Sequence, residues 1–313
     1  MLLSVLTSNL EVSLNLTEKD IKILSDVDFM LLKAAMKVSS KASGCLLLLE
    51  LGICSIKFIL KKKRLSFLYS LLASENSSLS RAVWDRQVKS PSKNDWCELV
   101  KKDLKELNIN LSFDDIENMS KSAFRNLINN ACKKACFQSL LLEKSKLSKG
   151  SEIVFSTFQT QNYLNPGNGL TIEEMRRIYH LRCRQVFLKC NFPSFFGDKK
   201  CVAPHQAFDR QKHVFYCSFF SSKNEIASPN IKYDDIFASN VKNQIEVMRI
   251  FYERLERRKG YLSPSNNGAP VDPIRGPDQR PRPRYGIREA TRKNRYIDNK
   301  RKTKQDVSKD NPQ

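Results

Sequence analysis

Apolar residues recur every three to four positions through most of the first 260 residues, the spacing that places side chains on one face of an α-helix. Helix-capping residues precede several of these runs: Thr17 and Ser120 stand where helices would begin, and Thr171 with Glu174 has the spacing of a capping box. Gly52 stands where a helix would stop. The predicted helices cover residues 17 to 38, a run ending at 52, 55 to 73, 96 to 107, a pair after a turn at 108 to 110 of which the second covers 120 to 142, 171 to 189, and 241 to 255.

The segments between the predicted helices are short or polar. Residues 74 to 95 are polar and contain Pro91, so they are interpreted as a connection. Residues 153 to 164 fit a helix or a strand, and NPGNG at 165 to 169 predicts a turn. No long alternating pattern and no internal repeat is present. The predicted fold class is mostly α, with helical bundle-like segments, a small Cys/His loop region and a disordered C-terminal tail.

The tail is predicted from a change of composition after Gly260. Residues 260 to 313 contain seven prolines and few large aliphatic residues, with 13 Lys and Arg against 6 Asp and Glu. Such a segment cannot bury enough apolar surface to offset the entropy lost on ordering. Residues 260 to 313 are therefore predicted to be a disordered basic tail with a net charge of +7.

Charge indicates the kind of partner. The 313 residues include 54 Lys and Arg against 33 Asp and Glu, which gives a formal net charge of +21. An excess of this size indicates a polyanion, either nucleic acid or an anionic membrane face. Two predicted helices carry basic stripes that would neutralise phosphates, although an ordinary solvated face explains a single stripe equally well. The predicted contacts are Lys57, Lys61 and Arg64 on the first helix, opposite its apolar face, and Arg176, Arg177, Arg182 and Arg184 along the second.

No segment is predicted to span a membrane or to direct secretion. The most apolar stretch, residues 45 to 60, is 16 residues long and contains two charged side chains, whereas a spanning helix needs about 20 apolar residues. The first residues lack the basic region of a signal peptide. Nine cysteines at scattered positions argue against a disulfide framework and for a reducing compartment. We expect the nucleus or the cytoplasm, with KKKR at 61 to 64 and KRKTK at 300 to 304 as import signals of low specificity.

A series of short motifs, in a fixed order between about residues 8 and 257, resembles the region after the palm of reverse transcriptases from non-LTR (LINE-type) retrotransposons. One departure is Ser13, where related elements usually carry Trp. Each motif is a short apolar or basic pattern, and their shared order carries the resemblance. The motifs are EVSLNLTEKDI at 11 to 21, VD at 27 to 28, LLK at 31 to 33, LELGI at 49 to 53, IKFI at 56 to 59, KRL at 63 to 65, LY at 68 to 69, SPSKNDW at 90 to 96, LRCR at 181 to 184 and KYDDIF at 232 to 237.

The resemblance implies a division of the chain. Residues 1 to 75 would form a thumb-like helical segment, and residues 76 to 192 a helical C-terminal region. Residues 193 to 259 would hold a degenerate Cys/His knuckle and a terminal helix, followed by the basic tail at 260 to 313.

The resemblance also implies where catalytic residues would lie. In this family the catalytic carboxylates are in the palm, include an aromatic-x-Asp-Asp hairpin and bind two divalent metals. The resemblance starts downstream of the palm and includes no endonuclease segment, so we expect no polymerase active site and no enzyme in this chain. YDD at 233 to 235 and FDD at 113 to 115 lack the intervening residue, and their acidic residues are interpreted as helix starts.

Members of this family commonly carry a Cys-Cys-His-Cys knuckle near the C-terminus. Cys201 stands at the first ligand position and His213 with Cys217 gives the final His-x3-Cys, but Pro204 replaces the second cysteine. His205 could supply the fourth ligand, which gives Cys-x3-His-x7-His-x3-Cys, a donor set that suits a structural Zn²⁺. The alternative is a decayed knuckle with two thiols and two exposed imidazoles.

Three functions remain open from the sequence. The first is a nucleic-acid-binding C-terminal fragment of a retrotransposon reverse transcriptase, with RNA or an RNA/DNA template-primer as partner and no small-molecule substrate. The second is a non-enzymatic helical interaction protein or an inactive retroelement remnant. The third, an active polymerase, requires a palm supplied from elsewhere.

Overall fold

The computed structural model describes residues 7–13, 16–75, 77–90, 92, 95–147, 152–186, 188, 191, 200–201, 205, 207–208, 210–221 and 231–262. These residues form α-helices and short 3-10 helices and contain no β-strand, which confirms the mostly α fold class. In chain order the elements are η1 (Leu10–Val12), α2 (Glu18–Ala35), α3 (Gly44–Leu51), α4 (Ile56–Leu72), α5 (Leu79–Lys89), α6 (Trp96–Glu106), α7 (Phe113–Asn118), α8 (Lys121–Ser145), η2 (Asn162–Leu164), η3 (Pro166–Asn168), α9 (Ile172–Arg182), α11 (Gln211–Tyr216), η4 (Ser218–Phe220), η5 (Tyr233–Phe237) and α12 (Val241–Leu262).

The predicted helix starts and the predicted stop at Gly52 are confirmed. Thr17 and Thr171 each form a complete capping box, and the Ser120 side chain accepts the N–H of Ala123 at the start of α8. Gly52 ends α3 with φ of 63°, the left-handed region that glycine adopts without strain. A Cβ at Gly52 would also lie 2.4 Å from the Gln159 backbone, so two constraints require glycine there.

The prediction of a connection over residues 74 to 95 is wrong, because α5 occupies Leu79–Lys89 within it. Ser78 caps this helix by accepting the N–H of Arg81. Trp84 is its one buried residue, and the Trp84 ring meets the rings of Trp96 and Phe113 edge-on at 5.5 and 4.8 Å. Trp84 therefore anchors α5 to its neighbours, and the prediction overlooked Leu79, Val83 and Trp84, whose spacing places them on one side of a helix.

The helix predicted over 171 to 189 ends early, at Arg182. Arg184 takes the left-handed conformation with φ of 52°, and the N–H of Gln185 reaches back to the carbonyl of His180 at 2.8 Å. This is the Schellman arrangement that usually requires glycine at the left-handed position. Because Arg184 and not a glycine takes the left-handed conformation, no helix-stop signal is present in the sequence at this position.

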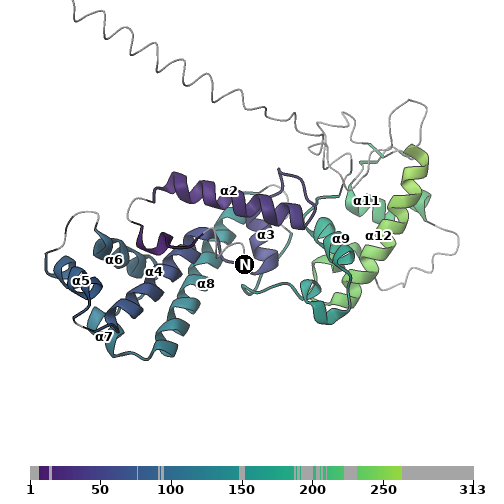
Figure 1. The fold of residues 1–313 in the computed structure, drawn as a ribbon. Helices are drawn as coiled ribbons and strands as arrows, with labels where there is room; N and C mark the ends of the chain where they lie inside the picture. The colour runs from purple at the N-terminus through teal and green to yellow at the C-terminus, as the bar shows by residue number, and fades with distance from the viewer. Residues whose placement is uncertain are drawn as a thin grey trace, which may run out of the picture.

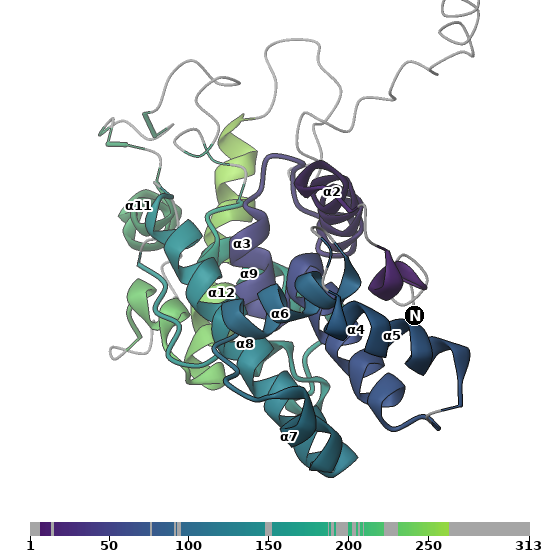
Figure 2. The ribbon, with the colours of Figure 1, turned by 90° about the vertical axis from the view of Figure 1, so that its left-hand side faces the viewer.

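Two large apolar clusters hold most of the helices of the described residues (Figures 1 and 2), and a small third one consists of Cys201, Cys217 and Phe220. One large cluster holds α4 to α8 together around Leu65, Leu68 and Trp84, on the left of Figure 1. The other large cluster joins α3, α9 and α12. In Figure 1, α3 lies between helices α4 to α8 on the left and helices α9 and α12 on the right. Helix α8 contributes to both clusters along its length. Both clusters draw on residues from either side of the predicted domain boundary at residue 75.

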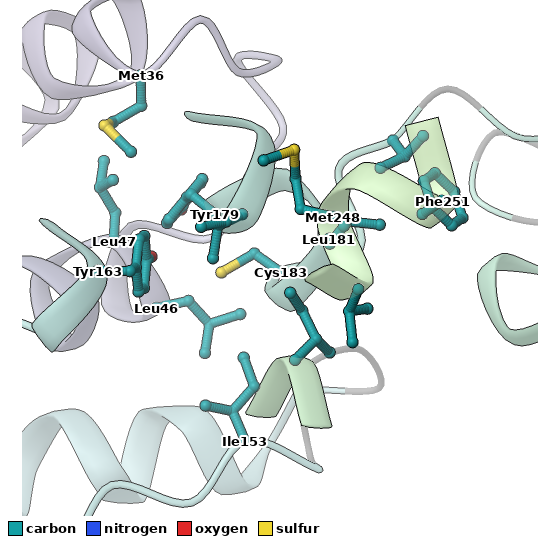
Figure 3. Close-up of a cluster of buried hydrophobic side chains, with 14 of the residues drawn as sticks. Met36, Leu46, Leu47, Ile153, Tyr163, Tyr179, Leu181, Cys183, Met248 and Phe251 are labelled. Carbon is teal, nitrogen blue, oxygen red and sulfur yellow. The ribbon is translucent and has the colours of Figure 1, made fainter. Parts of the chain in front are cut away.

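The second cluster brings together segments that are far apart in the sequence (Figure 3). Leu46 and Leu47 of α3 face Tyr179 and Leu181 of α9, and Met248 of α12 lies beside them. Each of these side chains is at most 2% exposed. The core therefore fixes α3 against the C-terminal helices, which is the frame for the buried ion pair described below.

Two predictions concern parts of the chain at the limit of the structure. The disordered tail predicted over 260 to 313 lies outside the described residues apart from its first positions, since α12 continues to Leu262. Among the described residues, no helix has both the length and the apolarity needed to cross a membrane.

Candidate metal centre and basic surface

The structure brings together the four residues that the sequence predicted as metal ligands. One ligand atom from each of Cys201, His205, His213 and Cys217 lies within 4.8 Å of every other. The two cysteines are buried, His213 is partly buried and His205 is exposed. The cluster therefore has two thiolate donors on the protein side and an imidazole on the solvent side.

Local backbone structure positions the cluster. The Cys201 N–H donates to the Ala207 carbonyl at 2.6 Å, and Lys200 forms an antiparallel bridge with Phe208, which brings the backbone on either side of His205 together. Helix α11 carries His213 and ends at Cys217. Phe220 packs against both cysteines, and the side chain of Arg257 from α12 donates to the Phe220 carbonyl at 2.9 Å. The cluster is thus tied to the last helix of the fold.

Two contacts orient the His205 ring. Its Nε2 lies 3.2 Å from the Cys217 Sγ, and its Nδ1 accepts the N–H of Ala207 at 3.3 Å. The His205 and His213 rings meet edge-on with centroids 4.8 Å apart. Both imidazoles therefore lie beside the cysteine sulfurs, with His205 on the exposed side, so all four side chains could bind one metal ion.

The donor set fits a divalent metal with tetrahedral preference. Zn–S bonds of about 2.3 Å and Zn–N bonds of about 2.0 Å place tetrahedral donor atoms roughly 3.3 to 3.8 Å apart. The upper limit of 4.8 Å among these atoms requires a contraction of about 1 Å, within the reach of side-chain rotation. These residues could hold a metal ion through two sulfur and two nitrogen donors.

The predicted basic stripe on α4 is wrong for two of its three members. Lys61 and Arg64 are only 5 and 6% exposed. Arg64 is bonded to Asp103 of α6, and Lys61 is bonded to Glu106 and lies 3.5 Å from Asp103. Although burial works against it, the Lys61 ammonium lowers the pKa of Glu106. Lys61 and Arg64 lie on the same side of α4 as the buried Leu68, four residues after Arg64. This side of α4 therefore faces α6 and not solvent.

Arg182 is likewise buried, at 1% exposure, and not on a surface that phosphate could reach. Its Nε donates to both Glu50 carboxylate oxygens at 2.9 and 3.2 Å, and its NH1 donates to the Ile236 carbonyl at 2.7 Å. The Tyr163 hydroxyl donates to the same carboxylate at 2.7 Å. Burial raises the pKa of Glu50, and the charge of Arg182 and the Tyr163 bond oppose that rise. This network joins α3, α9, η2 and η5 in the interior.

The remaining predicted phosphate contacts are partly exposed and each pairs with a carboxylate. Lys57 lies 3.6 Å from Glu18, and Arg184 lies 2.6 Å from Glu152. Arg176 and Arg177 both approach Glu173, at 3.7 and 3.9 Å. Arg176 also donates to the Ala35 carbonyl, and the Arg177 guanidinium stacks on the Tyr252 ring at 4.9 Å. These cations are therefore less available to phosphate than their positions in the sequence suggested.

A set of exposed lysines that the sequence prediction missed lies where α4 and α8 pack together. Lys62 of α4 and Lys133 of α8 lie on helices that pack against each other. After the hydrogen bond from Cys136, their charges also lower the pKa of the Cys54 thiol. Lys134 adjoins Lys133 and is exposed as well. None of the three forms an ion pair with the described residues. The sequence could have indicated these lysines, because each lies outside the apolar face of its helix and is therefore expected to be exposed.

The two acidic pairs lie at helix starts, as predicted. Asp115 closes a capping box with Ser112 at α7, and the hydrogen bonds from Ser112 lower the pKa of Asp115. Asp235 occupies the equivalent position in η5, and Asp234 pairs with Lys212 at 2.9 Å. Neither pair lies in a β-hairpin of the described residues.

An apolar groove runs beside α5. It has a volume of about 350 Å³ and is lined mainly by η1, α4, α5 and α6. Leu79 and Val83, one turn apart on α5, are 81 and 50% exposed along it. Adjacent exposed aliphatic side chains that line a groove are typical of a ligand-binding or protein-interaction site.

Comparison of the chain with protein-family models, with curated proteins and with solved structures gives no match. The chemistry of the residues, together with the resemblance described above, therefore carries the functional conclusion.

Proposed function

We propose that this chain is a non-catalytic, nucleic-acid-binding helical module with a structural zinc ion, equivalent to the part of a LINE-type reverse transcriptase that follows the palm. The observation that carries the proposal is the gathering of Cys201, His205, His213 and Cys217, with one ligand atom from each within 4.8 Å of the others. Cys201, His213 and Cys217 stand at ligand positions of the knuckle in that family, whereas Pro204 replaces its second cysteine and the neighbouring His205 would supply the fourth donor.

Zinc is the metal that the donors favour. Two thiolates and two imidazoles form a soft to borderline set, and Zn²⁺ takes such sets in tetrahedral geometry without a preference imposed by d-electrons. When bound, the ion would close the turn after Cys201 onto α11. Since α11 and η4 contact α12, zinc would stabilise the end of the fold and would have no catalytic role.

Nucleic acid is the partner that the charge favours. The chain carries a net charge of +21, and Lys62, Lys133 and Lys134 lie exposed where α4 and α8 meet. Exposed cations bind the phosphate backbone mainly by releasing counterions, which gives salt-sensitive affinity with little base selectivity. Of the contacts predicted from the sequence, Lys57, Arg177 and Arg184 keep enough exposure to contribute. The proposal places the chain in the nucleus or the cytoplasm, where thiols stay reduced.

The metal is tested by counting it. Full-length protein purified under reducing conditions and offered zinc should retain one equivalent after desalting, and Co²⁺ should give the visible absorption of a tetrahedral thiolate site. Cys217→Ser should lower the affinity strongly, whereas Cys45→Ser, which changes a buried cysteine of α3, should retain one equivalent. A wild-type chain that retains no zinc, or equal retention by both variants, contradicts the zinc site.

Nucleic-acid binding is tested by titrating labelled RNA and RNA/DNA template-primer at several salt concentrations. The triple variant Lys62→Ala/Lys133→Ala/Lys134→Ala should bind more weakly than a matched control that removes three other exposed lysines, Lys19→Ala/Lys22→Ala/Lys242→Ala. Primer extension with this chain alone should give no product, and measurable incorporation of nucleotides would contradict the non-catalytic part of the proposal.

The alternative, a helical protein-interaction module, is favoured by one observation, the apolar groove beside α5. The same titration separates the two functions. No binding to either nucleic acid at low salt would exclude the first and leave the second.

A further inference from the structure

Three cysteines meet where α3, α4 and α8 come together. Cys54 lies in the connection between α3 and α4, directly before Ser55, the N-cap residue of α4. Cys132 and Cys136 lie one turn apart on α8 and are buried, at 2 and 0% exposure. Cys54 is partly exposed, so it is the least buried residue of the three.

Cys54 and Cys136 are close neighbours. The Cys136 Sγ accepts the N–H of Ser55, the residue directly after Cys54, at 3.4 Å. A hydrogen bond from the Cys136 thiol also acts on the pKa of Cys54. The Cys136 sulfur is therefore held against the backbone immediately after Cys54. Cys132 makes no such bond among the described residues, although it is close in sequence.

The surroundings make the two thiols chemically unequal. The hydrogen bond from Cys136 lowers the pKa of Cys54 against the effect of burial, and Lys133 and Lys62 act in the same direction. The positive end of α4 adds a field of the same sign. The pKa of Cys136 is raised by the bond it donates and by burial, and burial raises the pKa of Cys132 to about 11.

We propose that Cys54 and Cys136 form a peroxide-sensitive dithiol, in which Cys54 is the reactive thiolate and Cys136 the resolving thiol. The Cys54 thiolate attacks one oxygen of hydrogen peroxide, the O–O bond breaks, and Cys54 sulfenic acid and hydroxide form, the hydroxide taking up a proton to become water. The Cys136 sulfur then attacks the Cys54 sulfur, and the sulfenic oxygen leaves as a second water with the Cys136 proton. Two thiols are oxidised and one peroxide is reduced.

The disulfide would link the start of α4 to the middle of α8. These helices carry the exposed Lys62 and Lys133, so the bond would lock together the two helices that present the proposed basic surface. Reduction by a thiol such as glutathione would reverse the step by attack at the sulfur of Cys54, the less buried of the two residues.

The first test measures which thiol reacts. Full-length protein with zinc is treated briefly at neutral pH with a limiting amount of iodoacetamide, and the alkylated positions are quantified by mass spectrometry. Cys54 should be alkylated at least tenfold faster than the buried Cys97 of α6, because the thiolate is the nucleophile and access is required. Equal rates at Cys54 and Cys97 would overturn the proposal.

The second test maps the bond formed with hydrogen peroxide. Trypsin separates Cys132 from Cys136, since Lys133 and Lys134 lie between them, and a Cys45→Ser background removes the other cysteine of the Cys54 peptide. The linked peptides should contain Cys54 and Cys136. The link should persist in Cys132→Ser and vanish in Cys54→Ser, a change at a partly exposed position that the fold should tolerate.

The disulfide is mapped in Cys45→Ser protein, which keeps both Cys54 and Cys136. The test therefore does not depend on whether a variant at Cys136 can fold. A link from Cys54 to Cys132, or Cys54 sulfinic acid without any disulfide, would overturn the assignment of Cys136 as the resolving thiol.

Discussion

Replacing Arg182 by methionine tests whether this cation holds the interior together. The substitution keeps most of the side-chain volume and removes the guanidinium that bonds Glu50 and the Ile236 carbonyl. Glu50 and Tyr163 would remain fully buried, with the carboxylate left without its counter-ion. Removing one partner of a buried ion pair costs about 3–5 kcal/mol, because the other charge stays desolvated.

The expected loss of stability is large enough to measure by urea unfolding. With a urea dependence of about 2 kcal/mol per molar, a loss of about 3–5 kcal/mol lowers the unfolding midpoint by about 1.5 to 2.5 M. Arg184→Met is the matched control, since Arg184 also pairs with a carboxylate but its side chain is 44% exposed. Exposed pairs contribute at most about 1 kcal/mol, so the control should move the midpoint by about 0.5 M or less.

The same variant has a pH dependence of definite sign. Burial raises the pKa of Glu50 and Arg182 opposes that rise, so Arg182→Met should move the folded-state pKa of Glu50 further above its ordinary value of 4.5. A carboxyl whose pKa is higher in the folded state binds more protons there, so stability is present below the unfolded-state pKa and is lost as the pH rises. The difference between wild type and Arg182→Met should therefore be larger at pH 8 than at pH 5.

Urea unfolding followed by circular dichroism at both pH values measures these differences. Equal losses for Arg182→Met and Arg184→Met would refute the reasoning, because they would mean that the buried network does not hold α3 against α9. A loss independent of pH would show that Glu50 is not the charge left behind.

Two further substitutions test the packing. Gly52→Ala should lower the free energy of unfolding by more than Gly169→Ala. Both glycines have positive φ, but only a Cβ at Gly52 would meet backbone, at 2.4 Å from Gln159. Equal losses in thermal unfolding would mean that this close approach does not contribute to stability. Trp84→Ala should cost about 3–5 kcal/mol in urea unfolding, because Trp84 is 3% exposed and anchors α5, whereas a loss below about 1 kcal/mol would mean that α5 does not depend on it.

Local chemistry near the backbone could be predicted from the sequence. The caps at Thr17 and Thr171 and the stop at Gly52 depend on residues within a few positions, and the structure confirms them. The end of α9 could not be predicted, because Arg184 takes the left-handed backbone conformation, which arginine rarely adopts. Helix α5 was overlooked, although Ser78 and the spacing of Leu79, Val83 and Trp84 could have predicted it. Only the partners of Trp84, the rings of Trp96 and Phe113, required the folded chain.

Of the two candidate sites, the Cys/His cluster was easier to predict from the sequence than the basic surface. The family resemblance, together with the position of His205, indicated the four Cys and His residues as one possible ligand set, and the structure brings them together. The basic residues were harder, since charge alone does not reveal a partner: Arg64 pairs with Asp103, 39 positions away, and Arg182 with Glu50, 132 positions away. A cation on a helix face that also carries buried leucines is more safely predicted as an ion pair than as a phosphate contact.

The salt dependence of nucleic-acid binding tests the central proposal most directly. Each phosphate neutralised by a lysine adds about 0.7 to 0.9 to the slope of log affinity against log salt concentration. For the full-length, zinc-loaded protein we predict a steep slope that becomes about 2 to 3 shallower in Lys62→Ala/Lys133→Ala/Lys134→Ala and changes less in Lys19→Ala/Lys22→Ala/Lys242→Ala. A flat slope in the wild type, or equal changes in the two triple variants, would contradict a phosphate-binding surface where α4 and α8 meet.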